Sequence, residues 1–138
     1  MKNNTSTNNL VISSGRRKTA VASVFLKNEK GSIKVNELDV EKYFPSEKEL
    51  ATFKKPFYLL GIASPESRFD ISIKVTGSSK SSQLGAVVLA VSKALADLNP
   101  ENNEILKKND MLTRDPRMVE RKKPNLRKAR KAAQFSKR

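Results

Sequence analysis

Residues 69–76, which read FDISIKVT, decide the fold of this chain. Apolar residues at positions 69, 71, 73 and 75 alternate strictly with polar residues at 70, 72, 74 and 76. Successive side chains of a strand point to opposite faces, so this pattern predicts a β-strand with one buried face. Such a strand needs partner strands and a layer that covers its apolar side.

Two helices that follow this strand can supply the covering layer. Residues 77–82 (GSSKSS) read as a flexible loop, and apolar residues then recur at helical spacing from about Gln83 to Leu98. Asn99-Pro100 ends this helix, and Pro100 suits the first position of a last short helix, ENNEILKK.

The partner strands are expected earlier in the chain. Residues 19–27 (TAVASVFLK) place apolar side chains on both faces, so this strand is predicted to be covered on both sides. The turn at Asn28–Gly31 predicts a hairpin that returns as a strand over Ser32–Asn36. Residues 10–12 (LVI) form a short apolar run that suits an edge strand.

Two short helices complete the body. Asp39 is placed to cap a helix over residues 40–44 that Pro45 stops. Ser46, followed three residues later by a Glu, is placed to start a second helix that reaches about Lys54, before Pro56. Together these elements predict an α+β domain in which helices pack on one face of a small sheet.

The end of the chain has a different character. Residues 113–138 contain eleven Lys or Arg against two acidic residues, a net charge of +9, and few apolar side chains. Such a segment cannot offset its ordering entropy with a core of its own, so it is predicted to be a basic arm for a polyanion. The alternative is a solvated terminus that only keeps the protein in solution.

Within this arm, Asp115-Pro116 predicts a cap and one or two helical turns through about Lys122, and Lys123-Pro124 predicts an extended path. Phe135 has two interpretations of equal weight: stacking on a base or ribose, or packing against another protein.

Composition excludes several other classes of function. The chain of 138 residues has no Cys and no His, so disulfides, cysteine zinc sites and histidine general bases are absent. Carboxylates are scattered, which gives no basis for a metal site, and no cofactor is expected. No apolar run is long enough to span a membrane, and no targeting signal is evident, so we expect an intracellular protein or a part of an assembly.

Two further basic features lie in the body. Gly15-Arg16-Arg17-Lys18 is expected to bring three cations together where the chain turns into a strand. The loop at 77–82 carries Lys80 at a helix N-terminus, where free N–H groups favour an anion. With the arm, the candidate RNA-binding residues are Arg16, Arg17, Lys18, Lys80, Arg114, Arg117, Arg121, Lys122, Lys123, Arg127, Lys128, Arg130 and Lys131.

Three stretches carry a resemblance to a known family. GRRKTAVASV from Gly15, LTRDPRMVERKK from Leu112 and the ending AQFSKR resemble ribosomal protein nine of the small subunit, in its bacterial and plastid form. The likeness covers about residues 13–138. It divides the chain into a lineage-specific or disordered extension (1–12), a globular RNA-anchoring domain (13–110) and an rRNA-threading tail (111–138).

The resemblance implies a structural, non-enzymatic role in translation. It implies a two-layer fold like domain two of small-subunit ribosomal protein five, with a left-handed crossover. It also implies a seat on the 3′ major domain of the rRNA, among the proteins of the small-subunit head, in the bacterial cytoplasm or chloroplast stroma. The tip would approach the anticodon stem-loop of the P-site tRNA through Phe135, Ser136, Lys137 and Arg138.

Two departures from the family pattern are visible. Gly77-Ser-Ser-Lys-Ser-Ser and Val88-Leu89 stand where the family has a Gly-rich loop and a helix with Arg-His, and Ala133 stands where it has Pro. Two rival functions are a free RNA chaperone or DNA-compacting protein, which shares the charge, and a phosphotransferase, which shares the general architecture.

Overall fold

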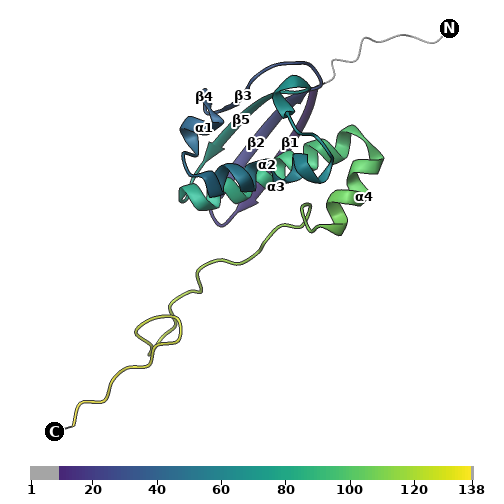
Figure 1. Cartoon of the computed structure of the whole chain (residues 1–138). Coiled ribbons are helices and arrows are strands. Elements are labelled where there is room, and N and C mark those ends of the chain that lie inside the picture. The colour runs from purple at the N-terminus through teal and green to yellow at the C-terminus, as the bar shows by residue number, and fades with distance from the viewer. Residues whose placement is uncertain (1–9, 138) are drawn as a thin grey trace.

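The computed structural model describes residues 10–137 and has an α+β fold. The strands are β1 (Leu10–Arg17), β2 (Ala20–Lys27), β3 (Ile33–Val35), β4 (Leu38–Asp39) and β5 (Asp70–Thr76). The helices are α1 (Val40–Tyr43), α2 (Glu47–Leu59), α3 (Lys80–Leu98) and α4 (Pro100–Lys108), with a 3₁₀ turn, η1 (Pro65–Ser67), before β5. The strands form one sheet of order β1-β2-β5-β3-β4, and α2 and α3 lie across one face of it (Figure 1).

The alternating stretch forms the middle of this sheet. In β5, Ile71, Ile73 and Val75 are at most 2% exposed, while the polar residues between them lie on the other face. Antiparallel pairing with β2 sets Val24 beside Ile73, and parallel pairing with β3 sets Val35 on its other side. The burial predicted from the alternation is therefore confirmed.

The predicted hairpin between residues 19–27 and 32–36 is wrong. β3 does not pair with β2, because β5 lies between them and forms hydrogen-bonded ladders with both. The buried apolar side chains of β5 thus lie between those of β2 and those of β3, an arrangement that a two-stranded hairpin of β2 and β3 cannot provide. Asn36 strengthens this arrangement, since its side chain accepts from the Val75 N–H and donates to the Val75 carbonyl, both at 2.9 Å.

Helices cover only one face of the sheet, so the prediction that residues 19–27 are covered on both sides is wrong. The core-facing residues of β2 are fully buried, whereas Val21 on the opposite face is 37% exposed. On the covered face, β1 approaches α3 closely, and Ser13 Oγ donates to the Ala90 carbonyl at 2.6 Å. Residues 10–12, which the resemblance assigned to an extension, form the start of β1.

Helix α2 runs beyond its predicted end and continues through Pro56 to Leu59. Proline removes one helical hydrogen bond, but the carbonyl left without that donor belongs to Thr52, which lies on the exposed side. Phe53, Pro56 and Phe57 are all buried by the helical path, which offsets the lost bond.

Helix starts follow the sequence with small shifts. Asp39 and Ser46 precede α1 and α2 as predicted, although neither side chain makes a capping hydrogen bond. Helix α3 begins at Lys80 and takes in the last part of the predicted loop, because Ser79 occupies its N-cap position. Pro100 is the first residue of α4, as expected.

Candidate nucleic-acid interface

A basic segment leaves the body after α4. Met111 and Leu112 pack partly against the core, and residues 113–137 contain no helix and no strand beyond one isolated bridge. Figure 1 shows the chain running away from the body over these residues. We call residues 113–138 the tail; Arg138 lies outside the described residues.

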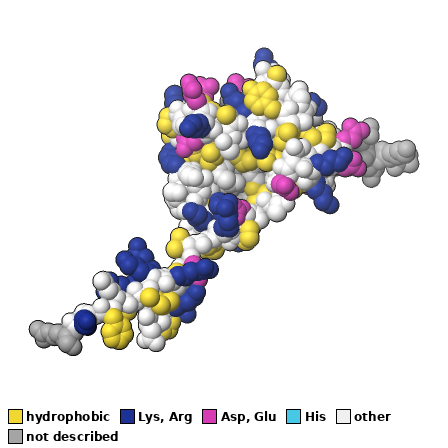
Figure 2. Space-filling model, turned by 60° about the horizontal axis from the view of Figure 1, so that its bottom comes forward, with side chains coloured by type: hydrophobic (Ala, Val, Ile, Leu, Met, Phe, Trp, Pro, Cys, Tyr) yellow, Lys and Arg dark blue, Asp and Glu magenta, His cyan; other side chains and the backbone are white. Residues whose placement is uncertain are grey.

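The described cations of the tail are all exposed. Figure 2 shows Lys and Arg side chains gathered along the part of the chain that extends from the body. These residues are Arg114, Arg117, Arg121, Lys122, Lys123, Arg127, Lys128, Arg130, Lys131 and Lys137. Val119 and Phe135, at 89% and 100% exposed, find no core here. The segment therefore presents charge and isolated apolar groups to whatever it meets.

The short helix predicted from Asp115 to Lys122 does not form. Asp115 does bind the backbone two residues on, since its Oδ1 accepts from the Arg117 N–H at 3.0 Å. However, Met118 and Val119 remain 58% and 89% exposed, and packing supplies most of the stability of a helix this short. Asp115 therefore stabilises a single turn of the chain with its side chain and does not cap a helix.

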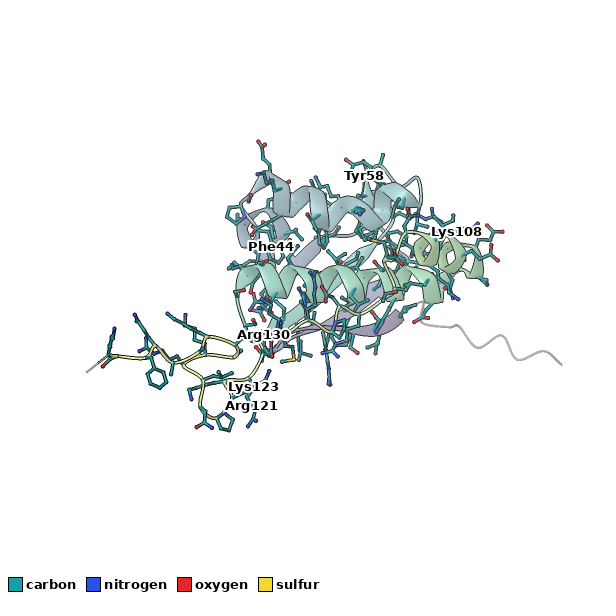
Figure 3. All side chains as sticks on the ribbon, turned by 90° about the horizontal axis from the view of Figure 1, so that it is seen from below. Phe44, Tyr58, Lys108, Arg121, Lys123 and Arg130 are labelled. Atoms are coloured by element: carbon teal, nitrogen blue, oxygen red, sulfur yellow. The ribbon has the colours of Figure 1, made fainter. Side chains whose placement is uncertain are left out.

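The extended path predicted at Pro124 is also wrong, because the chain folds back on itself. The Arg127 N–H donates to the Lys131 carbonyl at 2.8 Å, and Leu126 and Ala132 form an isolated antiparallel bridge. Glu120 pairs with Lys123 and with Arg130 across this small loop. Figure 3 shows Arg121, Lys123 and Arg130 in this part of the tail.

The three cations expected to gather after Gly15 are separated instead. The strand continues to Arg17, so Arg16 and Arg17 point to opposite faces of the sheet. Arg16 is exposed on the face of the sheet that the helices leave uncovered. Lys18 is exposed in the tight turn before β2, where its φ is +51°. Arg17 lies on the covered face and binds the tail: its Nη1 donates to the Arg117 carbonyl at 2.8 Å, and its Nη2 lies 3.1 Å from Asp115 Oδ2.

Lys80 is engaged within the body. Its Nζ donates to the Tyr43 carbonyl at 2.9 Å and lies 3.6 Å from the centroid of the Tyr43 ring. The proposed anion site at the start of α3 therefore has its only lysine directed toward α1.

Sequence reasoning missed a basic surface on the uncovered side of the sheet. We define the open face as the outward residues of β1, β2, β3 and β5, whose charged members are Arg16, Lys27, Lys34, Lys74 and Asp70. Its net charge is +3, and the rest of residues 10–106 carries ten basic and ten acidic side chains. The signal was present in the alternation, which places Lys74 outward, but it required the order of the strands.

Apolar groups accompany these charges. Ile12 is 60% exposed, and half-buried Phe25 lies under Lys74, whose Nζ is 6.0 Å from the ring centroid. Within residues 10–137, no group of three or more His, Cys, Asp or Glu side chains could hold a metal ion. In the same range, no helix is both long enough and apolar enough to cross a membrane.

Comparison with known proteins agrees with these features. The family model described as ribosomal protein S9/S16 matches residues 15–138. The chain is 48% identical over 124 residues to the small ribosomal subunit protein uS9 of Chlorobaculum tepidum, covering 90% of this chain and 94% of that protein. The uS9 proteins of Amoebophilus asiaticus and Parabacteroides distasonis are each 46% identical over the same shares. The chain therefore belongs to the ribosomal protein S9/S16 family, in its bacterial type.

Proposed function

We propose that this protein is a non-enzymatic, structural constituent of the small ribosomal subunit that binds the rRNA of the head, in the 3′ major domain. The observation that carries the proposal is the tail, whose ten described cations are all exposed and not buried in a core. Phosphates recur along an RNA backbone, so cations spread along a chain can follow it. Other proteins of the small-subunit head are its expected neighbours.

The open face gives the body its own contact with RNA in this proposal. All the net charge of residues 10–106 lies there, and Ile12, Val21 and Phe25 offer apolar surface between the cations. Phosphates attract the cations, and an unstacked base can rest on an aromatic or apolar side chain. The open face would thus anchor the body while the tail threads the RNA.

The end of the tail has a narrower role in the proposal. Phe135, Ser136 and Lys137 are all exposed, and Arg138 follows them in the sequence. We place this tip at the anticodon stem-loop of the P-site tRNA, where two cations can contact phosphates and Phe135 can stack. This placement rests on the family resemblance of the terminal stretch AQFSKR.

Sedimentation tests the structural role. Tagged protein should travel with the small subunit through a sucrose gradient and stay with it at moderate salt, because many phosphate contacts act together. A free RNA chaperone would be released and would appear at the top of the gradient. Release of this protein at a salt concentration that leaves other head proteins bound would refute the proposal.

Deletion of Lys137 and Arg138 tests the tip. Loss of two exposed charges should weaken P-site tRNA binding by roughly two- to thirtyfold, from about 0.2–1 kcal/mol for each contact. Subunit assembly should be unchanged. The matched control is Lys107→Gln with Lys108→Gln, which removes two charges from the end of α4. Impaired assembly with normal tRNA affinity would instead make the tip an assembly element.

A further inference from the structure

Arg17 is held on the body by its stem. It is the last residue of β1, and its side chain lies on the covered face of the sheet, beside α3. Gly85 of α3 leaves room for it, since a Cβ at that position would lie only 3.2 Å from Arg17 Cγ. The guanidinium is consequently carried to the edge of the body on a packed stem, with 21% of the side chain exposed.

The same guanidinium grips the start of the tail at two points. One nitrogen donates to the main-chain carbonyl of Arg117, and another pairs with the carboxylate of Asp115. Among the hydrogen bonds and ion pairs of residues 10–137, these are the ones that join the body to the tail. Lys18, Met118 and Val119 line a shallow hollow at the same place, so the tail rests against the β1–β2 turn.

Asp115 is fully committed to this arrangement. Besides Arg17, it accepts from the Arg117 backbone N–H and from Nε and Nη2 of the Arg117 guanidinium, at 2.8–3.1 Å. The carboxylate therefore lies between two guanidinium groups, which also fixes the local turn of the chain. Arg117, with 82% of its side chain exposed, keeps room for a phosphate beside this contact.

The chain is attached to the body at two successive places. One attachment would fix only the position at which the tail starts, whereas two also fix the direction in which it leaves. The first is the packing of Met111 and Leu112 on the core, and the second lies three to five residues later, at Asp115 and Arg117. We infer that Arg17, Asp115 and the main chain of Arg117 form a clamp that sets the direction in which the tail leaves the body. Arg17 is then a positioning residue, in contrast to its expected role as an RNA ligand.

The value of the clamp rests on the proposed function. A tail that leaves in a fixed direction loses less conformational entropy when it is ordered on RNA, which is the general benefit of preorganisation. Some twenty residues separate Arg117 from the end of the chain. A change of direction at the start of the tail therefore displaces the tip. The clamp thus serves the placement of the tip without contacting RNA itself.

The free full-length protein allows a direct test, because the chain has no cysteine. Spin labels are placed on Thr52→Cys, which is exposed on α2, and on Val119→Cys, two residues beyond the clamp. They report the distance between the body and the first residues of the tail, which we call the tail root. The clamped chain should give a narrow distance distribution. Arg17→Ala should broaden it about twofold or more, since the residues beyond Leu112 then behave as a flexible linker.

The control is Arg16→Ala, which removes the same charge one residue earlier but on the open face, and it should leave the distribution narrow. Asp115→Asn removes the ion pair but leaves the hydrogen bond from Arg17 to the Arg117 carbonyl, so it should broaden the distribution less than Arg17→Ala does. The double variant should broaden it no further than Arg17→Ala alone, because Arg17→Ala already removes both contacts. Arg17→Lys keeps a charge that can pair with Asp115 but loses the second nitrogen that binds the Arg117 carbonyl. Its distribution should be intermediate in width between those of the unchanged protein and of Arg17→Ala. Equal distributions for Arg17→Ala and Arg16→Ala would overturn the inference, as would additive effects in the double variant.

A second measurement connects the clamp to function and keeps the two proposals distinguishable. Small subunits reconstituted with the Arg17→Ala protein should assemble, yet bind P-site tRNA more weakly than subunits with the Lys55→Ala protein, which lacks one exposed cation of α2 away from the open face and the tail. The distance measurement needs no ribosome, so a failure of the ribosomal proposal would leave its result standing. Broadening without any change in tRNA binding would refute the positioning role and leave the clamp as a structural contact only.

Discussion

At the scale of single residues, the contact between β1 and α3 depends on the small size of Gly15. A Cβ at this position would lie 2.1 Å from the Ala86 carbonyl oxygen and 2.7 Å from the Ala90 nitrogen. Both are backbone atoms of a helix, which cannot move without disturbing its hydrogen bonds. Glycine is therefore required here for close approach, and this approach also brings Ser13 within reach of Ala90.

Gly15→Ala should destabilise the protein by about 1–3 kcal/mol, the usual cost of overpacking a well-packed contact. Ser14→Ala, on the open face one residue earlier, should change stability by less than about 0.5 kcal/mol. Urea unfolding followed by circular dichroism measures both. Equal stabilities for the two variants would show that β1 moves away from α3 at little cost.

A second prediction at this scale concerns pH. Hydrogen bonds from Arg117, with a further attraction to Arg17, hold the pKa of Asp115 well below its ordinary value of 3.8. When folding lowers the pKa of an acid, the group contributes stability at every pH above its pKa in the unfolded state. This stability is lost only as pH falls through the pKa of the folded state. The distance distribution between body and tail root should therefore be the same from pH 5 to pH 8. A distribution that broadens between pH 6 and pH 5 would contradict this assignment.

At the scale of elements, local sequence patterns predicted single strands and helices better than they predicted which strands pair. The alternation in residues 69–76 and the periodicity of residues 83–98 are properties of one segment, and both describe the buried faces correctly. The neighbours of β5 depend on residues more than thirty positions away, so the turn at Asn28–Gly31 favoured a hairpin that does not exist. Likewise, Pro56 argues against a helix locally, but burial of Phe57 decides the outcome.

The candidate site shows the same division. The charge of the tail could be predicted by counting, because exposure needs no partner. The role of Arg17 could not, since its partner Asp115 is 98 positions away and both residues are ordinary surface types in the sequence. The open face was hidden for a similar reason: Arg16, Lys34 and Lys74 come from three strands far apart in the sequence, and they share one face of the sheet only through the strand order.

The open face yields a prediction about RNA affinity. Lys34→Gln with Lys74→Gln should weaken binding to a fragment of the rRNA 3′ major domain and lower the salt slope by about 1.4–1.8, if each lysine meets one phosphate. The matched control is Lys48→Gln with Lys55→Gln, which removes two exposed lysines of α2 from another part of the surface. Binding titrations at several salt concentrations measure the slopes. Equal losses in the two pairs would indicate general charge attraction in place of a defined surface.

At the scale of the whole molecule, stability and binding are assigned to different parts of the chain. The core is formed by the sheet, by α2 and α3, by Val40 of α1 with the adjacent Phe44, and by Leu106 of α4, with Met111 and Leu112 at its margin. Beyond these residues the tail makes local contacts and the clamp, and it carries +9 of the total charge of +14. A protein built this way can fold without its RNA and still reserve most of its charge for it.

Truncation after Leu112 separates these two properties. The urea m-value reports the surface exposed on unfolding, so it should be nearly unchanged, because the tail is already exposed in the folded protein. The salt slope of RNA binding should fall by about 8–10, the value expected if the eleven cations of the tail each meet a phosphate. A large loss of m-value would show that the tail completes the core. An unchanged slope would place the phosphate contacts on the body, and the arm would then be a solvated terminus.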